Sequence, residues 1–209
     1  MNKVDYIEKN RVHFNENELS RLEKYINNED ELKNVKVVMS YFKPHRIIHE
    51  QLKSLIKDSS TKILDLGCGA GMWSVLLATY NADVTAIDIS DINIKITKLR
   101  AKRNNVKINA FTGSCADSGL ANGSFDIILG SAIIHHLTED IETLTWSEVY
   151  RLLKPGGTAI FFEPVANSKL LEFIRLLIPI FQKHNPRPSI LQKSYKIFKD
   201  NAIHPERTN

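Results

Sequence analysis

Short apolar runs alternate with helical patterns through the middle of the chain. The runs with the length of buried strands are Lys62–Leu66, Asp83–Ile89, Val106–Thr112, Ser124–Gly130 and Thr158–Phe162. Apolar residues recur at helical spacing over the intervening stretches Met72–Tyr80, Asp91–Lys102 and Thr138–Leu153. This alternation predicts an α/β fold, with a doubly wound, mostly parallel sheet that has helices on both faces.

The N-terminal stretch, residues 1–57, has helical patterns and is expected to form a helical extension before this core. Asn15 is a candidate N-cap for a helix whose apolar residues follow at helical spacing. A second helix is expected over Leu32–Met39. Pro44 is expected to start a third, because proline is favoured in the first turn of a helix.

The C-terminal stretch, residues 165–209, departs from the alternation that runs through the core, residues 58–164. It contains an apolar helical pattern over Ser168–Phe181 and no convincing pair of strands, so we expect curtailed edge strands within a single domain. Residues 164–209 hold eight Lys and Arg against three Asp and Glu. A solvated basic face is the preferred interpretation, since aromatic residues are not interleaved with the charges.

Composition places the chain among soluble globular proteins. With 209 residues, 43% of them hydrophobic, it can bury a substantial single core. No uninterrupted apolar run reaches transmembrane length, and the N-terminal stretch is too polar for a signal peptide. A structural disulfide between Cys68 and Cys115 is not expected, and these features together favour a cytoplasmic protein.

A glycine-rich turn follows the first predicted strand. Gly67, Gly69 and Gly71 let the backbone turn tightly and approach a ligand closely, and a helical pattern starts at Met72. Met72 occupies the position of the third glycine in a dinucleotide-binding fingerprint, so that fingerprint is incomplete. A phosphate-binding loop also fails, because no Gly-Lys-Ser/Thr closes the turn.

Two carboxylates at strand ends narrow the choice of ligand. Asp65 precedes the glycine turn, where it would repel a pyrophosphate but suits a ligand with an ammonium group. Asp88 lies at the end of the next predicted strand, twenty-one residues after Gly67, where it can accept hydrogen bonds from both ribose hydroxyls. An adenosyl ligand that carries amino-acid charge and no phosphate satisfies both conditions. S-adenosyl-L-methionine is that ligand.

Four motifs follow one another along the chain: DLGCGAG, AIDIS, the stretch from Ser114 to Leu137 that ends in HHL, and RLLKPGG. In this order they resemble the class I, Rossmann-like S-adenosylmethionine-dependent methyltransferases of the small-molecule type, over roughly residues 47–164. The resemblance implies that Asp117 accepts a hydrogen bond from the adenine amino group. The residues expected to bind the cofactor are Asp65, Gly67, Cys68, Gly69, Gly71, Asp88, Ile89, Cys115, Ala116, Asp117, Gly130 and Ser131.

Catalysis of methyl transfer rests first on alignment of the acceptor with the methyl group, and an acceptor that must lose a proton benefits from a base. The candidate catalytic residues are His136, Glu163 and His135. His136 matches a histidine common in the resembled family, and a packing role is its alternative. Glu163 ends the fifth predicted strand and could equally act as a hydrogen-bonding orienter.

The resemblance also implies that N-terminal helices help to close the acceptor pocket, with Tyr41, Phe42 and His45 as candidates. No metal-ligand spacing appears in the sequence. Nucleic acid is not the expected acceptor, because the Asn-Pro-Pro-Tyr-type motif of nucleic-acid amino methyltransferases is absent where this chain has Gly130–Ile133.

Two functions from different classes remain after these considerations. The first is an S-adenosylmethionine-dependent methyltransferase that acts on a small-molecule acceptor by in-line displacement. The alternative is a methyltransferase-like cofactor-binding or scaffold protein without turnover, which the short C-terminal stretch motivates. The apolar pattern over Ser168–Phe181 is compatible with a core helix, a lid over the acceptor or the interface of a homodimer.

Overall fold

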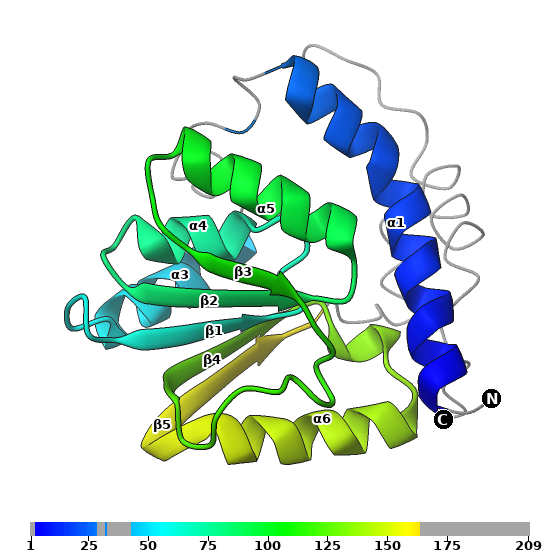
Figure 1. Cartoon of the computed structure of the whole chain (residues 1–209). Coiled ribbons are helices and arrows are strands. Elements are labelled where there is room, and N and C mark those ends of the chain that lie inside the picture. Colours follow the sequence, from blue (N-terminus) through cyan, green and yellow to red (C-terminus); the bar gives the residue numbers. More distant parts are fainter. Residues whose placement is uncertain (1–2, 29–31, 33–42, 164–209) are drawn as a thin grey trace, which may run out of the picture.

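The computed structural model describes residues 3–28, 32 and 43–163 of the chain. Within them, five parallel strands form one sheet in the order β3-β2-β1-β4-β5 (Figure 1). The strands are β1 (Lys62–Leu66), β2 (Asp83–Asp88), β3 (Asn109–Thr112), β4 (Phe125–Ser131) and β5 (Leu153–Phe162). The predicted doubly wound α/β fold is therefore confirmed. The strand order reverses at β1, which lies between β2 and β4, and ligands of such sheets bind at the carboxyl ends of the strands beside that point.

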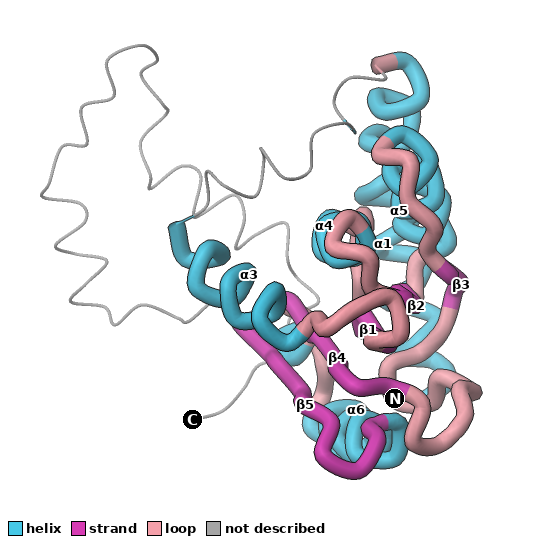
Figure 2. The backbone as a smooth tube through the Cα atoms, turned by 90° about the vertical axis from the view of Figure 1, so that its left-hand side faces the viewer, coloured by secondary structure: helices cyan, strands magenta, loops and turns pink. Residues whose placement is uncertain are grey.

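Helices cover both faces of the sheet (Figures 1 and 2). They are α3 (Lys43–Leu55), α4 (Met72–Ala78), α5 (Asp91–Arg103) and α6 (Glu139–Leu152). Leu52 of α3 and Leu76 of α4 pack with Ile63 and Ile127 on one face. Val149 of α6 packs with Leu64 on the other face. Because successive strand residues point to opposite faces, the apolar runs of β1 and β4 fill both layers of the core.

A long helix, α1 (Lys3–Asn27), stands across the carboxyl ends of the strands (Figure 1). Asn15 lies in the middle of this helix, so the expectation that Asn15 begins a helix was wrong. Its side chain instead contacts the N-terminus of α5, where its Oδ1 accepts a hydrogen bond of 2.6 Å from the hydroxyl of Ser90. At the far end of α1, Arg103 donates to the carbonyl of Tyr25 at 2.9 Å. These bonds hold α1 against α5.

Most element boundaries agree with the sequence pattern to within a few residues, with one informative exception. The Lys154–Gly157 stretch was expected to end a helix and precede a strand at Thr158. Instead α6 ends at Leu152 and β5 begins at Leu153. Leu153 pairs with Phe125 and Thr158 with Ile127, so the stretch between them is accommodated as a register shift within β5.

Several expectations fall on residues outside the described part of the chain. They concern the helix over Leu32–Met39 except for Leu32 itself, the side chains of Tyr41, Phe42 and His45, and all of residues 165–209. Within the described ranges, no helix has both the length and the apolar character needed to cross a membrane. No group of three His, Cys, Asp or Glu side chains in those ranges is arranged to hold a metal ion.

Candidate active site

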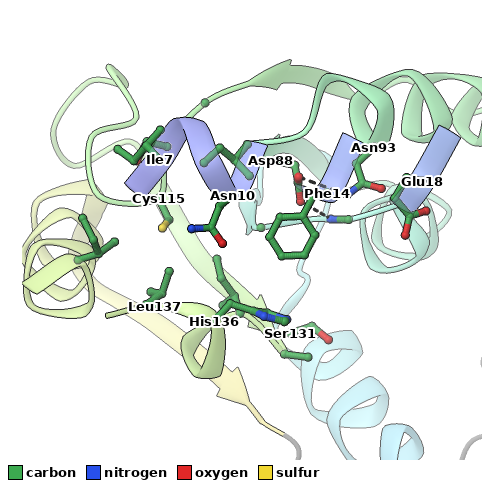
Figure 3. Close-up of a pocket in the computed structure, with 18 of the residues that line it drawn as sticks. Ile7, Asn10, Phe14, Glu18, Asp88, Asn93, Cys115, Ser131, His136 and Leu137 are labelled. Atoms are coloured by element: carbon green, nitrogen blue, oxygen red, sulfur yellow. Dashed lines mark hydrogen bonds between the residues drawn. The ribbon is translucent and has the colours of Figure 1, made fainter. Parts of the chain in front are cut away.

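A cavity of about 270 Å³ lies between α1 and the carboxyl ends of the strands (Figure 3). Its floor comes from the loops that follow β1, β2, β3 and β4. Residues on the floor include Gly67, Gly69, Asp88, Ile89, Cys115 and Ser131. Six of the twelve residues expected to bind the cofactor therefore line one cavity at the expected edge of the sheet.

The three glycines of the turn after β1 have different surroundings. A Cβ on Gly67 would meet the Cδ1 of Ile133 at 2.3 Å, and one on Gly71 would meet the Oγ1 of Thr97 at 2.5 Å. Gly69 has a φ of +51°, and a Cβ there would meet no atom within 4 Å. Gly69 also lines the cavity. It is therefore the glycine at which the backbone is open to a ligand, whereas Gly71 serves the packing of α5 against the turn.

Asp88 is buried at the end of β2 and joins three parts of the floor. Its Oδ2 accepts a bond of 2.8 Å from the backbone N–H of Gly69, and its Oδ1 accepts bonds from the N–H of Ser90 and the amide of Asn93. Burial raises the pKa of Asp88 above its usual value, the charge of Glu18 acts in the same direction, and the hydrogen bonds oppose this shift. Asp88 thus fixes the turn after β1 relative to α5 while its carboxylate borders the cavity.

Asp65 lies beneath the cavity and does not line it. It is 1% exposed, and its Oδ2 accepts a short hydrogen bond from the hydroxyl of Ser74 in α4. Burial raises its pKa to about 6, although the hydrogen bonds from Ser74 act to lower it. The carboxylate therefore joins β1 to α4, and its expected contact with the ammonium group of a ligand stays a prediction.

The roof of the cavity comes from α1. The resemblance implied that N-terminal helices help to close the pocket, but the candidates named for that role were Tyr41, Phe42 and His45 and not residues of α1. Tyr6, Asn10, Phe14 and Glu18 recur every four residues and face the cavity. In Figure 3, Asn10 and Phe14 point from α1 toward His136 and Ser131. The four-residue spacing is visible in the sequence, but these residues are a mixture of polar and aromatic types and do not resemble the apolar stripe of a packed helix.

One wall of the cavity is the short 3-10 helix η2 (Ile134–His136), which carries His136. The ring of Phe14 meets the ring of His136 edge to face, with centroids 5.3 Å apart. The hydroxyl of Tyr6 donates a short hydrogen bond to the backbone carbonyl of His136. The side chain of His136 is therefore placed between the floor and the roof.

Glu163 holds this wall in place from the end of β5. Its carboxylate accepts from the backbone N–H groups of Ile133 and Ile134, each at 2.9 Å, and from Nδ1 of His135 at 2.6 Å. Burial raises the pKa of Glu163, but the hydrogen bond from His135 and those from the backbone outweigh it, so that its pKa lies below the usual value. Neither Glu163 nor His135 lines the cavity, which places both behind His136.

The other residues expected to bind the cofactor lie next to the lining. The Sγ of Cys68 is 3.9 Å from the Oγ1 of Thr97, and burial raises the pKa of this thiol. A Cβ on Gly130 would meet the ring of Phe161 at 2.2 Å, so that glycine allows β4 and β5 to pack. Asp117 is exposed in a turn, and its backbone N–H donates to the carbonyl of Ser114 at 3.4 Å. Ala116 is buried beside it.

Comparison with known proteins agrees with this geometry. Residues 63–157 match a family model described as a methyltransferase domain. A ubiquinone biosynthesis O-methyltransferase of Cereibacter sphaeroides is 31% identical over 99 residues, which cover 47% of this chain and 39% of that protein. The enzyme of the same name from Pelagibacter ubique is 32% identical over 139 residues, covering 66% of this chain and 56% of that protein. This chain therefore spans about half or less of the length of these curated relatives.

Among solved structures, the PH0226 protein from Pyrococcus horikoshii superposes with a TM-score of 0.53 at 28% sequence identity. The superposition covers 64% of this chain and 60% of that protein. Over residues 63–157, this chain is therefore similar to a methyltransferase domain. The matched residues include the glycine turn, Asp88 and η2, all of which border the cavity, whereas α1 lies outside the match.

The residues that line the cavity fit S-adenosylmethionine, the cofactor expected from the sequence. Gly69 leaves open space for a ligand against the backbone, and the carboxylates of Asp88 and Glu18 disfavour a phosphate but tolerate a sulfonium and an ammonium group. The apolar side chains of Ile7, Leu137 and Ile141 lie at the end of the cavity nearest Cys115. A flat aromatic base is compatible with that end, and a ribose with the end that contains Asp88.

Proposed function

We propose that this methyltransferase transfers a methyl group from S-adenosylmethionine to a hydroxyl group of a small, largely apolar acceptor. One observation carries the proposal: a single cavity is bordered by the glycine turn, by Asp88 and by the side chain of His136. The printed names of the curated relatives, ubiquinone biosynthesis O-methyltransferase, support an oxygen acceptor. Those relatives are matched over only part of their length. The proposal of a hydroxyl acceptor therefore rests equally on the side chain of His136 in the cavity wall.

Asp88, Gly69 and the backbone around Cys115 are the residues proposed to hold the cofactor. The cofactor supplies an activated methyl group, so the protein has mainly to align the acceptor and exclude water. The roof formed by α1 serves this exclusion, because its residues Tyr6 and Asn10 are both buried. Among the described residues that line the cavity, Arg21 is the only Lys or Arg, and it already donates to Glu18 at 2.7 Å.

His136 is proposed to receive the proton that the acceptor hydroxyl loses when its oxygen bonds to the methyl carbon. A neutral imidazole is suited to this step near neutral pH. Phe14, from the roof, supplies an apolar surface at the His136 ring for the acceptor. Glu163 and His135 are proposed to act indirectly, by fixing the turn on which His136 is carried.

A direct test combines product detection with a variant of the proposed base. The wild-type chain should convert S-adenosylmethionine to S-adenosylhomocysteine in the presence of a panel of small phenols and catechols, and mass analysis should find a product 14 mass units heavier. His136→Gln should lower kcat at least 100-fold and leave cofactor affinity within threefold, since general-base catalysis typically contributes 10²–10⁴-fold.

A matched control is His49→Gln, because His49 pairs with Tyr80 away from the cavity at 2.7 Å. This control should retain wild-type turnover. Cofactor binding without any methylated product from the panel or from a metabolite extract would favour the alternative, a cofactor-binding protein without turnover.

A further inference from the structure

Asn93, in the first turn of α5, has a buried carboxamide oxygen without a donor. Asn93 is 6% exposed and borders the cavity. Its Oδ1 is the one buried side-chain polar atom, among the residues that the structure describes, for which no hydrogen-bond partner is found. Buried acceptors in folded proteins are nearly always paired, so this oxygen needs an explanation.

The orientation of the Asn93 amide follows from its contact with Asp88. The Nδ2 of Asn93 is 3.3 Å from Oδ1 of Asp88. A carboxylate only accepts hydrogen bonds, so the NH₂ group has to face Asp88, and the amide oxygen has to face the opposite way. The unpaired oxygen is therefore a consequence of the Asp88 contact and not of an arbitrary choice between the two amide orientations.

The neighbouring side chains do not supply the missing donor. Glu18 of α1 borders the same end of the cavity and offers acceptors (Figure 3). Arg21 donates to both carboxylate oxygens of Glu18, at 2.7 and 2.9 Å. The backbone N–H of Asn93 donates to the hydroxyl of Ser90 at 3.1 Å. This end of the cavity is therefore rich in acceptors, and a ligand that binds there has to bring donors.

We propose that Oδ1 of Asn93 accepts a hydrogen bond from one ribose hydroxyl of S-adenosylmethionine, while Asp88 accepts from the other. A ribose offers two neighbouring hydroxyl donors, which match the two adjacent acceptors. Asn93 thus has two roles: its amide nitrogen orients Asp88, and its oxygen binds the ligand. This inference rests on the cofactor in the proposed function and divides between two residues a contact that the sequence had assigned to Asp88 alone.

Calorimetry with S-adenosylhomocysteine and its 2′-deoxy and 3′-deoxy analogues tests the proposal. The wild-type chain should bind each analogue at least fivefold more weakly than the parent ligand, because each hydroxyl has its own acceptor. Asn93→Ala should bind the parent ligand at least tenfold more weakly, and it should no longer distinguish the parent from one of the two analogues. Asn109→Ala, an exposed change at the start of β3, should behave as wild type.

The outcomes separate this inference from the proposed function. Failure of the wild-type chain to bind S-adenosylhomocysteine would overturn both. If the wild-type chain binds S-adenosylhomocysteine normally and binds either deoxy analogue with the same affinity, the inference alone is overturned. This comparison uses only the wild-type chain. Equal weakening of all three ligands by Asn93→Ala would also overturn it, since that pattern reports only the loss of Asp88 orientation.

Discussion

Asn15 in the middle of α1 accepts a hydrogen bond of 2.6 Å from the hydroxyl of Ser90, the N-cap residue of α5. The same Ser90 donates its backbone N–H to Asp88 at 2.9 Å. The roof of the cavity is thereby connected through a single residue to the carboxylate that borders the proposed ribose subsite. The position of α1 over the cavity and the orientation of Asp88 should therefore depend on each other.

Asn15→Ala should loosen the roof without unfolding the sheet. The lost bond is expected to cost about 1 kcal/mol, which corresponds to a several-fold weaker affinity for S-adenosylhomocysteine. Hydrogen exchange should accelerate in α1 and stay unchanged in β1 and β4. Asn17→Ala, an exposed change two residues along the same helix, is the control. Equal exchange rates in α1 of the wild-type and Asn15→Ala chains would show that this bond does not hold the roof.

Gly69→Ala should abolish cofactor binding at a modest cost in stability. The backbone there has a φ of +51°, so a side chain introduces strain of about 1–2 kcal/mol and also occupies space at the cavity. Gly119→Ala separates the two effects, because Gly119 has a φ of +69°, has equally open surroundings and does not line the cavity. Calorimetry should find normal binding in Gly119→Ala. Similar affinities in the two variants would place Gly69 away from the ligand.

The core of the site could be predicted because it depends on local sequence. A buried strand, a glycine turn and an aspartate at the end of the next strand are patterns within about 25 residues. Asp65 and Asp88 were assigned to a ligand for that reason. The sequence could not show that Asp65 is turned toward Ser74 and sits beneath the cavity, since this depends on how α4 packs against β1.

The resemblance implied that N-terminal helices help to close the pocket, but the α1 residues that form the roof were missed, because their sequence does not have the pattern of a packed helix. Asn10, Glu18 and Arg21 interrupt the apolar period along the face that α1 turns to the cavity. The sequence predicts Asn15 as a helix N-cap because asparagine is favoured there, and its side chain does bind at a helix N-terminus. That terminus belongs to α5, which is 75 residues further along the chain. Local propensity identified the chemistry of Asn15 but not its partner.

Variants of Glu163 test whether this residue positions His136 or takes part directly in catalysis. Glu163→Ala removes the acceptor for three backbone N–H groups and for His135, so turnover should fall at least tenfold through displacement of His136. Glu163→Gln keeps an acceptor for the backbone and should restore part of kcat, with the pH profile of kcat unchanged in shape. Loss of one limb of that profile in Glu163→Gln would instead identify Glu163 as a titrating catalytic group.

Asp65 should make the protein less stable as pH rises from about 4 to 6. Its pKa is about 6 in the folded protein and near 3.8 in the unfolded chain, so the folded state binds more protons in this interval. The stability that it contributes is fully present below pH 4 and falls by up to about 3 kcal/mol above pH 6. Urea unfolding at several pH values should find that the free energy of unfolding of the wild type falls relative to that of Asp65→Asn over this interval, since the raised pKa of Asp88 acts equally in both proteins. Parallel pH profiles for the two proteins would contradict the assignment.

The central claim is that the cavity beneath α1 binds S-adenosylmethionine through the end of β2. Titration calorimetry of S-adenosylhomocysteine into the wild type, Asp88→Ala and Asp83→Ala tests it most directly. Asp83 begins β2 and is exposed at the opposite end of the strand, so its replacement should leave affinity unchanged. Asp88→Ala should weaken binding at least tenfold, since a charge-assisted hydrogen bond contributes about 1.5–3 kcal/mol. Equal affinities for all three proteins, or no binding by the wild type, would contradict the account.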